Sequence, residues 1–259
     1  MEAAFRVVFA ALFGLAVGSF LTVAVYRVPR KESVVAPRSR CPACGAQIRP
    51  RDNIPVLSYL LLRGRCRSCK IRISPRYLFL ELATAALFAG AALRFHATYT
   101  AALLALFFAV MLAVAVIDVE QRIVPNRIVY PSLVGFGALV AIGALVGDRL
   151  NLAGAGLGLL AYGGGLLLVA LISPGGMGMG DVKLAGLIGL VLGALGLRYV
   201  AVAAAAAILA GGLGAIALVV FTRASRKQAI PFGPYLAGGA VVAAFLAPRI
   251  ASWYTALAR

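Results

Sequence analysis

Hydrophobic residues gather in eight segments of the chain, separated by stretches that carry most of the polar and charged residues. Within each segment the apolar residues occupy every face of the helix that could form, as a helix in contact with lipid requires. Each segment is close to the roughly 20 residues that span a bilayer. The segments lie at about 5–26, 76–94, 99–117, 127–147, 151–172, 181–197, 199–221 and 231–247. The pattern predicts an all-α polytopic membrane protein with about eight transmembrane helices.

The amino-acid composition agrees with a membrane protein. Hydrophobic residues make up 63% of the 259 residues and charged residues only 13%. Soluble domains average about 45–50% apolar and about 25% charged residues. The difference excludes a soluble globular protein, a disordered chain and a coiled-coil rod.

Basic residues are concentrated on one side of the predicted membrane. The chain has 25 Lys and Arg against 8 Asp and Glu, which gives a net charge of +17. The stretch 27–76 holds 13 of these basic residues, and six more fall in loops on the same side: Arg122, Arg127, Lys183, Arg223, Arg226 and Lys227. By the positive-inside rule this side is cytoplasmic, and both chain termini face the other side. The charge therefore indicates cytoplasmic loops next to membrane lipids, and no nucleic-acid partner is expected.

The long polar segment 27–75 is the one candidate for an extramembrane subdomain, between a first helix at 1–26 and a membrane domain at 76–259. Four cysteines in it follow the spacing C-x2-C-x21-C-x2-C: Cys41, Cys44, Cys66 and Cys69. Two such pairs can supply four thiolates to one tetrahedral zinc ion, which would fold a loop with little apolar core of its own. Because all four ligands are cysteines, no position stays open for water, and the zinc is expected to be structural. The alternative is two reduced or redox-active cysteine pairs.

Four acidic residues lie in or beside the predicted spans: Glu81, Asp118, Glu120 and Asp181. Acids at membrane depth are costly and are therefore functional candidates. Asp118 ends the third span and Asp181 opens the sixth, so both are expected at one depth near the cytoplasmic surface. Two carboxylates that share one proton can activate water and protonate a peptide carbonyl, which is the chemistry of an aspartic protease. Alternatively, they are helix-end acids paired with Arg122 and Lys183.

The residues around these acids refine the hypothesis. Gly178 and Gly180 precede Asp181 and allow the backbone to approach a substrate chain closely. Glu120 lies two residues beyond Asp118 and is expected to be a solvated loop acid, because it points to another helix face. Glu81, about two turns into the second span, is either a structural partner of a loop arginine or part of a second site.

At these residues the sequence resembles the bacterial type IV prepilin peptidases, also called type IV leader peptidases, over nearly the whole chain. The matching stretches are Gly18–Pro29, the two cysteine pairs with Asp52–Leu60 between them, Leu62–Cys66, Glu81, Gly178-x-Gly180-Asp181 and Pro231–Gly238. Gly178-x-Gly180-Asp181 is similar to the GxGD motif of membrane aspartyl proteases, and Asp118 matches the family's other catalytic aspartate. Asn126 and Tyr77-Leu78 depart from the family's usual Asp and Tyr-Pro, and neither touches the proposed pair.

The resemblance implies a function and a location. The family cleaves the leader of type IV prepilins and pseudopilins after a glycine at the cytoplasmic face of the bacterial inner membrane, for pili, type II secretion or competence. Asp118 and Asp181 would be catalytic, with Gly178, Gly180 and Lys183 supporting the substrate and the loop.

A second activity is implied by the cysteine loop. Family members that have this loop commonly N-methylate the new N-terminus with S-adenosylmethionine as methyl donor. Gly64 and Glu81 are the candidate residues for this activity in the present chain.

Two alternatives stay open from the sequence. The first is a peptidase without methyltransferase activity. The second is a proton-coupled membrane transporter with Asp118 and Asp181 as a proton relay. A transporter should have paired internal repeats and broken helices, and the sequence has no convincing internal symmetry.

Overall fold

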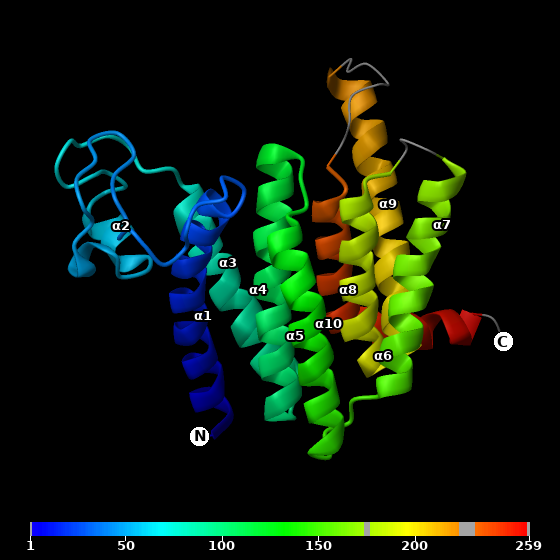
Figure 1. Cartoon of the computed structure of the whole chain (residues 1–259). Helices are drawn as coiled ribbons and strands as arrows, with labels where there is room; N and C mark the ends of the chain where they lie inside the picture. Colours follow the sequence, from blue (N-terminus) through cyan, green and yellow to red (C-terminus); the bar gives the residue numbers. More distant parts are fainter. Residues whose placement is uncertain (1, 174–176, 223–230, 258–259) are drawn as a thin grey trace. The chain divides into compact units, whose positions relative to one another are not determined.

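The structure is a computed structural model that describes residues 2–173, 177–222 and 231–257. Within these residues it is all-helical, and β-structure is limited to two isolated bridges in the loop after the first helix. Figure 1 labels the long helices. The helices are α1 (Glu2–Arg27), η1 (Pro50–Asp52), α2 (Leu57–Leu61), α3 (Arg76–Arg94), α4 (Thr98–Gln121), α5 (Asn126–Leu145), α6 (Leu152–Leu159), the π-helical turn η2 (Leu160–Gly164), α7 (Gly165–Ile172), α8 (Met179–Leu195), α9 (Leu197–Thr222) and α10 (Gly233–Leu257). The all-α prediction is confirmed.

Seven helical segments of the described residues are long and apolar enough to cross a membrane. They correspond to seven of the eight predicted spans, with α6, η2 and α7 forming one continuous segment, Leu152–Ile172. The sixth predicted span forms α8, which has 17 residues and is therefore roughly 26 Å long. This helix is short because Gly196, with a φ of 130°, ends it directly before α9.

The chain divides into two compact units, Met1–Ala113 and Val114–Arg259, with the division inside α4. In the first unit α1 packs on α3. Two glycines of α1 allow a close approach. A Cβ at Gly14 would lie 2.8 Å from the Cα of Ala85, and a Cβ at Gly18 would lie 2.7 Å from the Cα of Glu81. The polar loop between α1 and α3 belongs to this unit.

In the second unit α8 is the central helix and contacts α5, α6, α7, α9 and α10. The contact between α6 and α8 is made by glycines: a Cβ at Gly158 would overlap the carbonyl oxygen of Gly189 and lie 2.9 Å from the Cα of Gly193. The glycines therefore permit backbone-to-backbone packing of the helix that carries Asp181. Three of the basic residues that predicted the orientation lie outside the described residues: Arg223, Arg226 and Lys227.

Candidate functional site

The two candidate catalytic acids lie at two helix ends in the second unit. Asp118 belongs to the last turn of α4 and is buried, with 4% of its surface exposed. Asp181 is the third residue of α8 and is half-buried. The two carboxyl groups are close enough to interact electrostatically. The fold therefore brings together two acids that are 63 residues apart in the sequence.

A main-chain group holds the Asp118 side chain. The backbone N–H of Gly233, at the start of α10, donates a buried hydrogen bond of 2.9 Å to Oδ2 of Asp118. A Cβ at position 233 would lie only 2.7 Å from the same oxygen. Gly233 therefore contacts the acid in a way that a larger residue could not. The sequence singled out the surrounding Pro231–Gly238 stretch, but it gave this glycine no role.

The glycines before Asp181 position the start of α8. Gly178 is the extended residue that precedes the helix, and its carbonyl accepts a 3.0 Å hydrogen bond from the backbone N–H of Asp181. The backbone of Gly178 also hydrogen-bonds to the Asp181 carboxylate. A Cβ at Gly180 would lie 2.7 Å from Cβ of Val124, in the segment that follows α4. Gly178 therefore shapes the first turn of α8, and Gly180 lets this turn lie close to the segment after α4.

Lys183 contacts two residues of α5. Its Nζ donates a 3.1 Å hydrogen bond to Oδ1 of Asn126 and lies 4.9 Å from the centre of the Tyr130 ring. These contacts join the first turns of α8 and α5. Within the described residues neither Asp118 nor Asp181 forms an ion pair, so pairing with Arg122 and Lys183 does not account for the two acids.

The four cysteines form a second cluster, in the loop of the first unit. Their sulfur atoms lie within 4.8 Å of one another, and Sγ of Cys41 and Cys69 are 3.8 Å apart. A tetrahedral zinc ion with bonds of about 2.3 Å separates its sulfur ligands by roughly 3.8 Å. None of the four cysteines forms a disulfide. The cluster therefore has the dimensions of a tetrathiolate metal site.

Each cysteine pair is part of a tight turn with the same hydrogen-bond pattern. The N–H of Cys41 donates to the carbonyl of Ala46, and the N–H of Cys66 donates to that of Ile71, both at 2.9 Å. The residue after each pair has a positive φ, 70° at Gly45 and 60° at Lys70. The backbone N–H groups of Cys69 and Ser68 lower the pKa of the Cys66 thiol to about 6. The backbone of the second turn therefore favours the thiolate of Cys66, the form that binds zinc.

A bidentate ion pair supports the second turn. Nη2 of Arg67 lies 2.6 Å from Oδ1 of Asp52, and Nε of the same arginine donates to both carboxylate oxygens. The hydrogen bonds from Arg67 hold the pKa of Asp52 below its usual value. This pair ties η1 to the second cysteine turn, a role that the sequence did not suggest for Asp52.

Glu81 and Gly64 shape the same loop. Oε2 of the buried Glu81 accepts a 2.7 Å hydrogen bond from the backbone N–H of Val56, and its carboxylate also bonds with Ser19. Glu81 therefore binds a backbone group of the loop and not a loop arginine. Gly64 has a φ of 64°, and a Cβ there would lie 3.0 Å from the ring of Tyr59.

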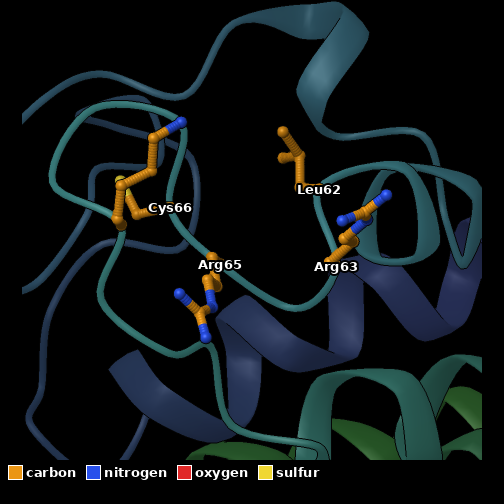
Figure 2. A pocket seen from close by; sticks show the side chains of 5 residues that line it. Leu62, Arg63, Arg65 and Cys66 are labelled. Carbon is orange, nitrogen blue, oxygen red and sulfur yellow. The ribbon is translucent and has the colours of Figure 1, made fainter.

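Next to Gly64 the loop forms a cavity of about 420 Å³ that is open to solvent, lined by Leu62, Arg63, Arg65, Cys66 and Lys70. Figure 2 shows Leu62 and Arg63 on one side of this cavity and Arg65 and Cys66 on the other. Three of the five lining side chains are basic, so the cavity is suited to an anionic group.

Comparison with known proteins matches both parts of the chain. The family model of the bacterial peptidase A24 N-terminal domain matches residues 12–95, and that of the type IV leader peptidase family matches residues 105–219. A Bacillus subtilis (strain 168) prepilin leader peptidase/N-methyltransferase is 38% identical over 247 residues, which cover 95% of this chain and 97% of that protein. Proteins of the same name from Pseudomonas aeruginosa and Aeromonas hydrophila are 34% and 33% identical, each covering 94% of this chain and 91% of the relative. No solved structure matches the chain.

Proposed function

The chain belongs to the type IV leader peptidase family, and on this basis we propose that it is a bifunctional prepilin peptidase and N-methyltransferase. It removes the leader of type IV prepilins or pseudopilins after a glycine and methylates the new N-terminus. The observation that carries the peptidase assignment is the approach of Asp118 and Asp181 at the ends of α4 and α8.

The proposed cleavage uses one proton shared by the two aspartates. The ionised carboxylate takes a proton from a water molecule, and the resulting hydroxide attacks the carbonyl carbon of the scissile peptide bond. The protonated carboxyl gives its proton to the carbonyl oxygen. When the tetrahedral intermediate collapses, a proton passes to the leaving amine. Burial of Asp118 and its bond to Gly233 keep its carboxyl group fixed for these transfers.

We place this site at the cytoplasmic face of the bacterial inner membrane. The C-terminal end of α4 and the N-terminal end of α8 are flanked by Arg122, Arg127 and Lys183, and basic loops favour the cytoplasmic side. A prepilin with a basic leader and an apolar helix would present its junction at this depth.

The cysteine loop is proposed to support methyl transfer. Cys41, Cys44, Cys66 and Cys69 would hold a structural zinc ion, and the sulfur distances fit that ion. S-adenosylmethionine would supply the methyl group. Gly64 and Glu81 act through the shape of the loop, because each contacts the loop's own residues, Tyr59 and Val56.

The test is turnover of a synthetic prepilin by the purified full-length protein, with and without S-adenosylmethionine, followed by mass spectrometry. We expect cleavage after the glycine in both reactions and one added methyl group only with the donor. Asp118→Asn and Asp181→Asn should each lower cleavage by a factor of about 10⁴ or more, since a dyad works as a unit. Glu120→Gln is the matched control, because this exposed acid lies two residues from Asp118.

The outcomes separate the alternatives. Near-normal cleavage by either Asn variant would exclude the dyad. Cleavage without methylation would leave a peptidase only. Proton flux in proteoliposomes without cleavage would favour the transporter.

A further inference from the structure

The short helix α2 presents an apolar face that the first unit leaves uncovered. Leu57, Leu60 and Leu61 are 48%, 59% and 73% exposed, and their spacing places them on one side of the helix. An adjacent side of the helix faces the loop: the Ser58 hydroxyl bonds with the carbonyl of Arg51 and the N–H of Ile54, each at 3.0 Å. Three exposed leucines beside a polar face are typical of a helix that lies in a membrane interface.

Glu81 sets the depth of this helix. The 2.7 Å bond from the N–H of Val56 ties the residue before α2 to a carboxylate inside α3. Glu81 is five residues after Arg76, the first residue of α3, so the bond lies roughly 7–8 Å below that helix end. Interfacial helices bury their apolar face by a similar distance, about 5–10 Å. In Figure 1, α2 lies at the level of the upper turns of α1.

A strained turn gives α2 its direction. Val56 has φ 62° and ψ −52°, a conformation that β-branched residues rarely adopt. The N–H of Leu57 bonds to the carbonyl of Pro55 across this turn. The Glu81 bond to the Val56 N–H holds the turn. The chain therefore keeps an unfavourable backbone conformation at Val56, the residue that sets the direction of α2 and of its leucine face.

Positive charge follows the leucines directly. Arg63, Arg65 and Lys70 are exposed and line the cavity after α2, as Figure 2 shows for the two arginines. Basic side chains next to an interfacial helix attract anionic lipid, by a factor of roughly five in partitioning for each charge near the surface. The apolar leucines therefore match the acyl chains of a leaflet, and the basic residues next to them match its phosphates.

We propose that α2 and the adjacent cavity form a docking surface for anionic phospholipid, with the leucines of α2 at the headgroup–acyl boundary and Arg63, Arg65 and Lys70 holding lipid phosphates. The docking fixes the cysteine loop against the cytoplasmic leaflet. This surface goes beyond the proposed catalytic activities and does not depend on them.

Tryptophan quenching in proteoliposomes tests the position of α2. The natural Trp253, the single tryptophan of the chain, is replaced by Phe, and Leu60→Trp is introduced into the full-length protein. Val35→Trp is the control, because Val35 lies in the same loop outside α2 and is 85% exposed. We expect brominated acyl chains to quench the tryptophan at position 60 several-fold more than the one at position 35. Adding Glu81→Ala should reduce that quenching.

Two other results would overturn the proposal. A tryptophan at position 60 that iodide quenches as readily as the one at position 35 would place α2 in water. One that neither iodide nor bromolipid quenches would show that protein covers the leucine face, either the rest of the chain or a second copy.

Charge variants test the phosphate contact. Arg65→Glu and Arg40→Glu make the same charge change directly before the second and the first cysteine pair, and only Arg65 lines the cavity. We expect quenching at position 60 to be stronger in vesicles containing phosphatidylglycerol than in phosphatidylcholine alone. Arg65→Glu should abolish that difference, and Arg40→Glu should preserve most of it. Equal loss in both variants would exclude a phosphate site at the cavity.

Discussion

At the scale of single residues, the placement of Asp118 depends on a backbone group. The N–H of Gly233 donates a hydrogen bond to the carboxylate, and Gly233 has no side chain that would displace this carboxylate. We predict that Gly233→Ala lowers kcat for prepilin cleavage by about 100-fold, since a shift of about 1 Å in a catalytic group has that effect. KM should change little, because the variant displaces a reacting group and not the bound substrate.

Gly238→Ala is the matched control for this prediction. Gly238 lies in the same helix, and a Cβ there would meet nothing within 4 Å. Its kcat, KM and melting temperature should stay near those of the parent protein. A Gly233→Ala protein with normal kcat, or with kcat and melting temperature lowered together as by misfolding, would exclude the positioning role.

Residue chemistry explains which parts of the candidate sites the sequence could predict. Asp118, Asp181 and the cysteines stand out because their side chains are costly in apolar segments or occur at a metal-binding spacing. Gly233 and Val56 contribute an N–H, which almost every residue possesses, so no sequence pattern identifies them. The role of Glu81 was open for the same reason, because its partner is a backbone group 25 residues earlier.

At the scale of elements, the glycine contact of α6 with α8 holds the helix that carries Asp181. Gly158 lies against the backbone of Gly189 and Gly193. Gly158→Ala should force the two helices apart and cost about 1–3 kcal/mol, as overpacking does. We expect a lower melting temperature of the purified protein in detergent, together with slower prepilin cleavage.

Gly156→Ala provides the comparison within α6, because a Cβ at Gly156 would meet nothing within 4 Å. It should leave the melting temperature unchanged or raise it slightly, since alanine favours a helix over glycine by up to about 1 kcal/mol. If both variants destabilised the protein equally, glycine flexibility and not helix contact would be the cause.

Hydropathy could predict the long helices but not their ends or their breaks. The apolar segments are unambiguous because a helix that spans a bilayer needs about 20 consecutive apolar residues. The early end of α8 depends on the φ of Gly196, and the π-helical turn η2 interrupts a segment that hydropathy reads as continuous. The helix α2, with five residues, is too short to show a periodic pattern.

At the scale of the whole molecule, the cysteine loop should depend on its metal. The freshly purified, reduced protein should contain about one zinc per chain. Replacing Cys41, Cys44, Cys66 and Cys69 by Ser should remove the zinc and make the loop sensitive to trypsin, because structural zinc contributes about 10–16 kcal/mol to such folds. Methyl transfer should be lost before cleavage. Elemental analysis and limited proteolysis provide the measurements.

Ser68→Ala is the control for the cysteine variant, since it alters an exposed side chain in the second turn and keeps the backbone N–H. Its zinc content and trypsin pattern should match the parent protein. Absence of zinc from the parent protein, or trypsin resistance after loss of all four thiols, would contradict the metal site.

The whole-molecule arrangement was the least accessible to sequence reasoning. Hydropathy identifies helices but carries no information on which of them pack together, so the division of the chain within α4 could not be anticipated. Packing depends instead on where small residues permit close contact, as Gly14 and Gly18 do between α1 and α3.

The order of residues in the loop has a consequence for biogenesis. All four cysteines precede Arg76, the first residue of α3, whereas Glu81 lies inside α3. A ribosome delivers the chain N-terminus first, so the thiol cluster is complete before the carboxylate that anchors α2 has been synthesised. A metal bound by the four thiols would therefore fold the loop before α3 is synthesised. The hydrogen bond from the Val56 N–H to Glu81 would then form on a loop that is already folded.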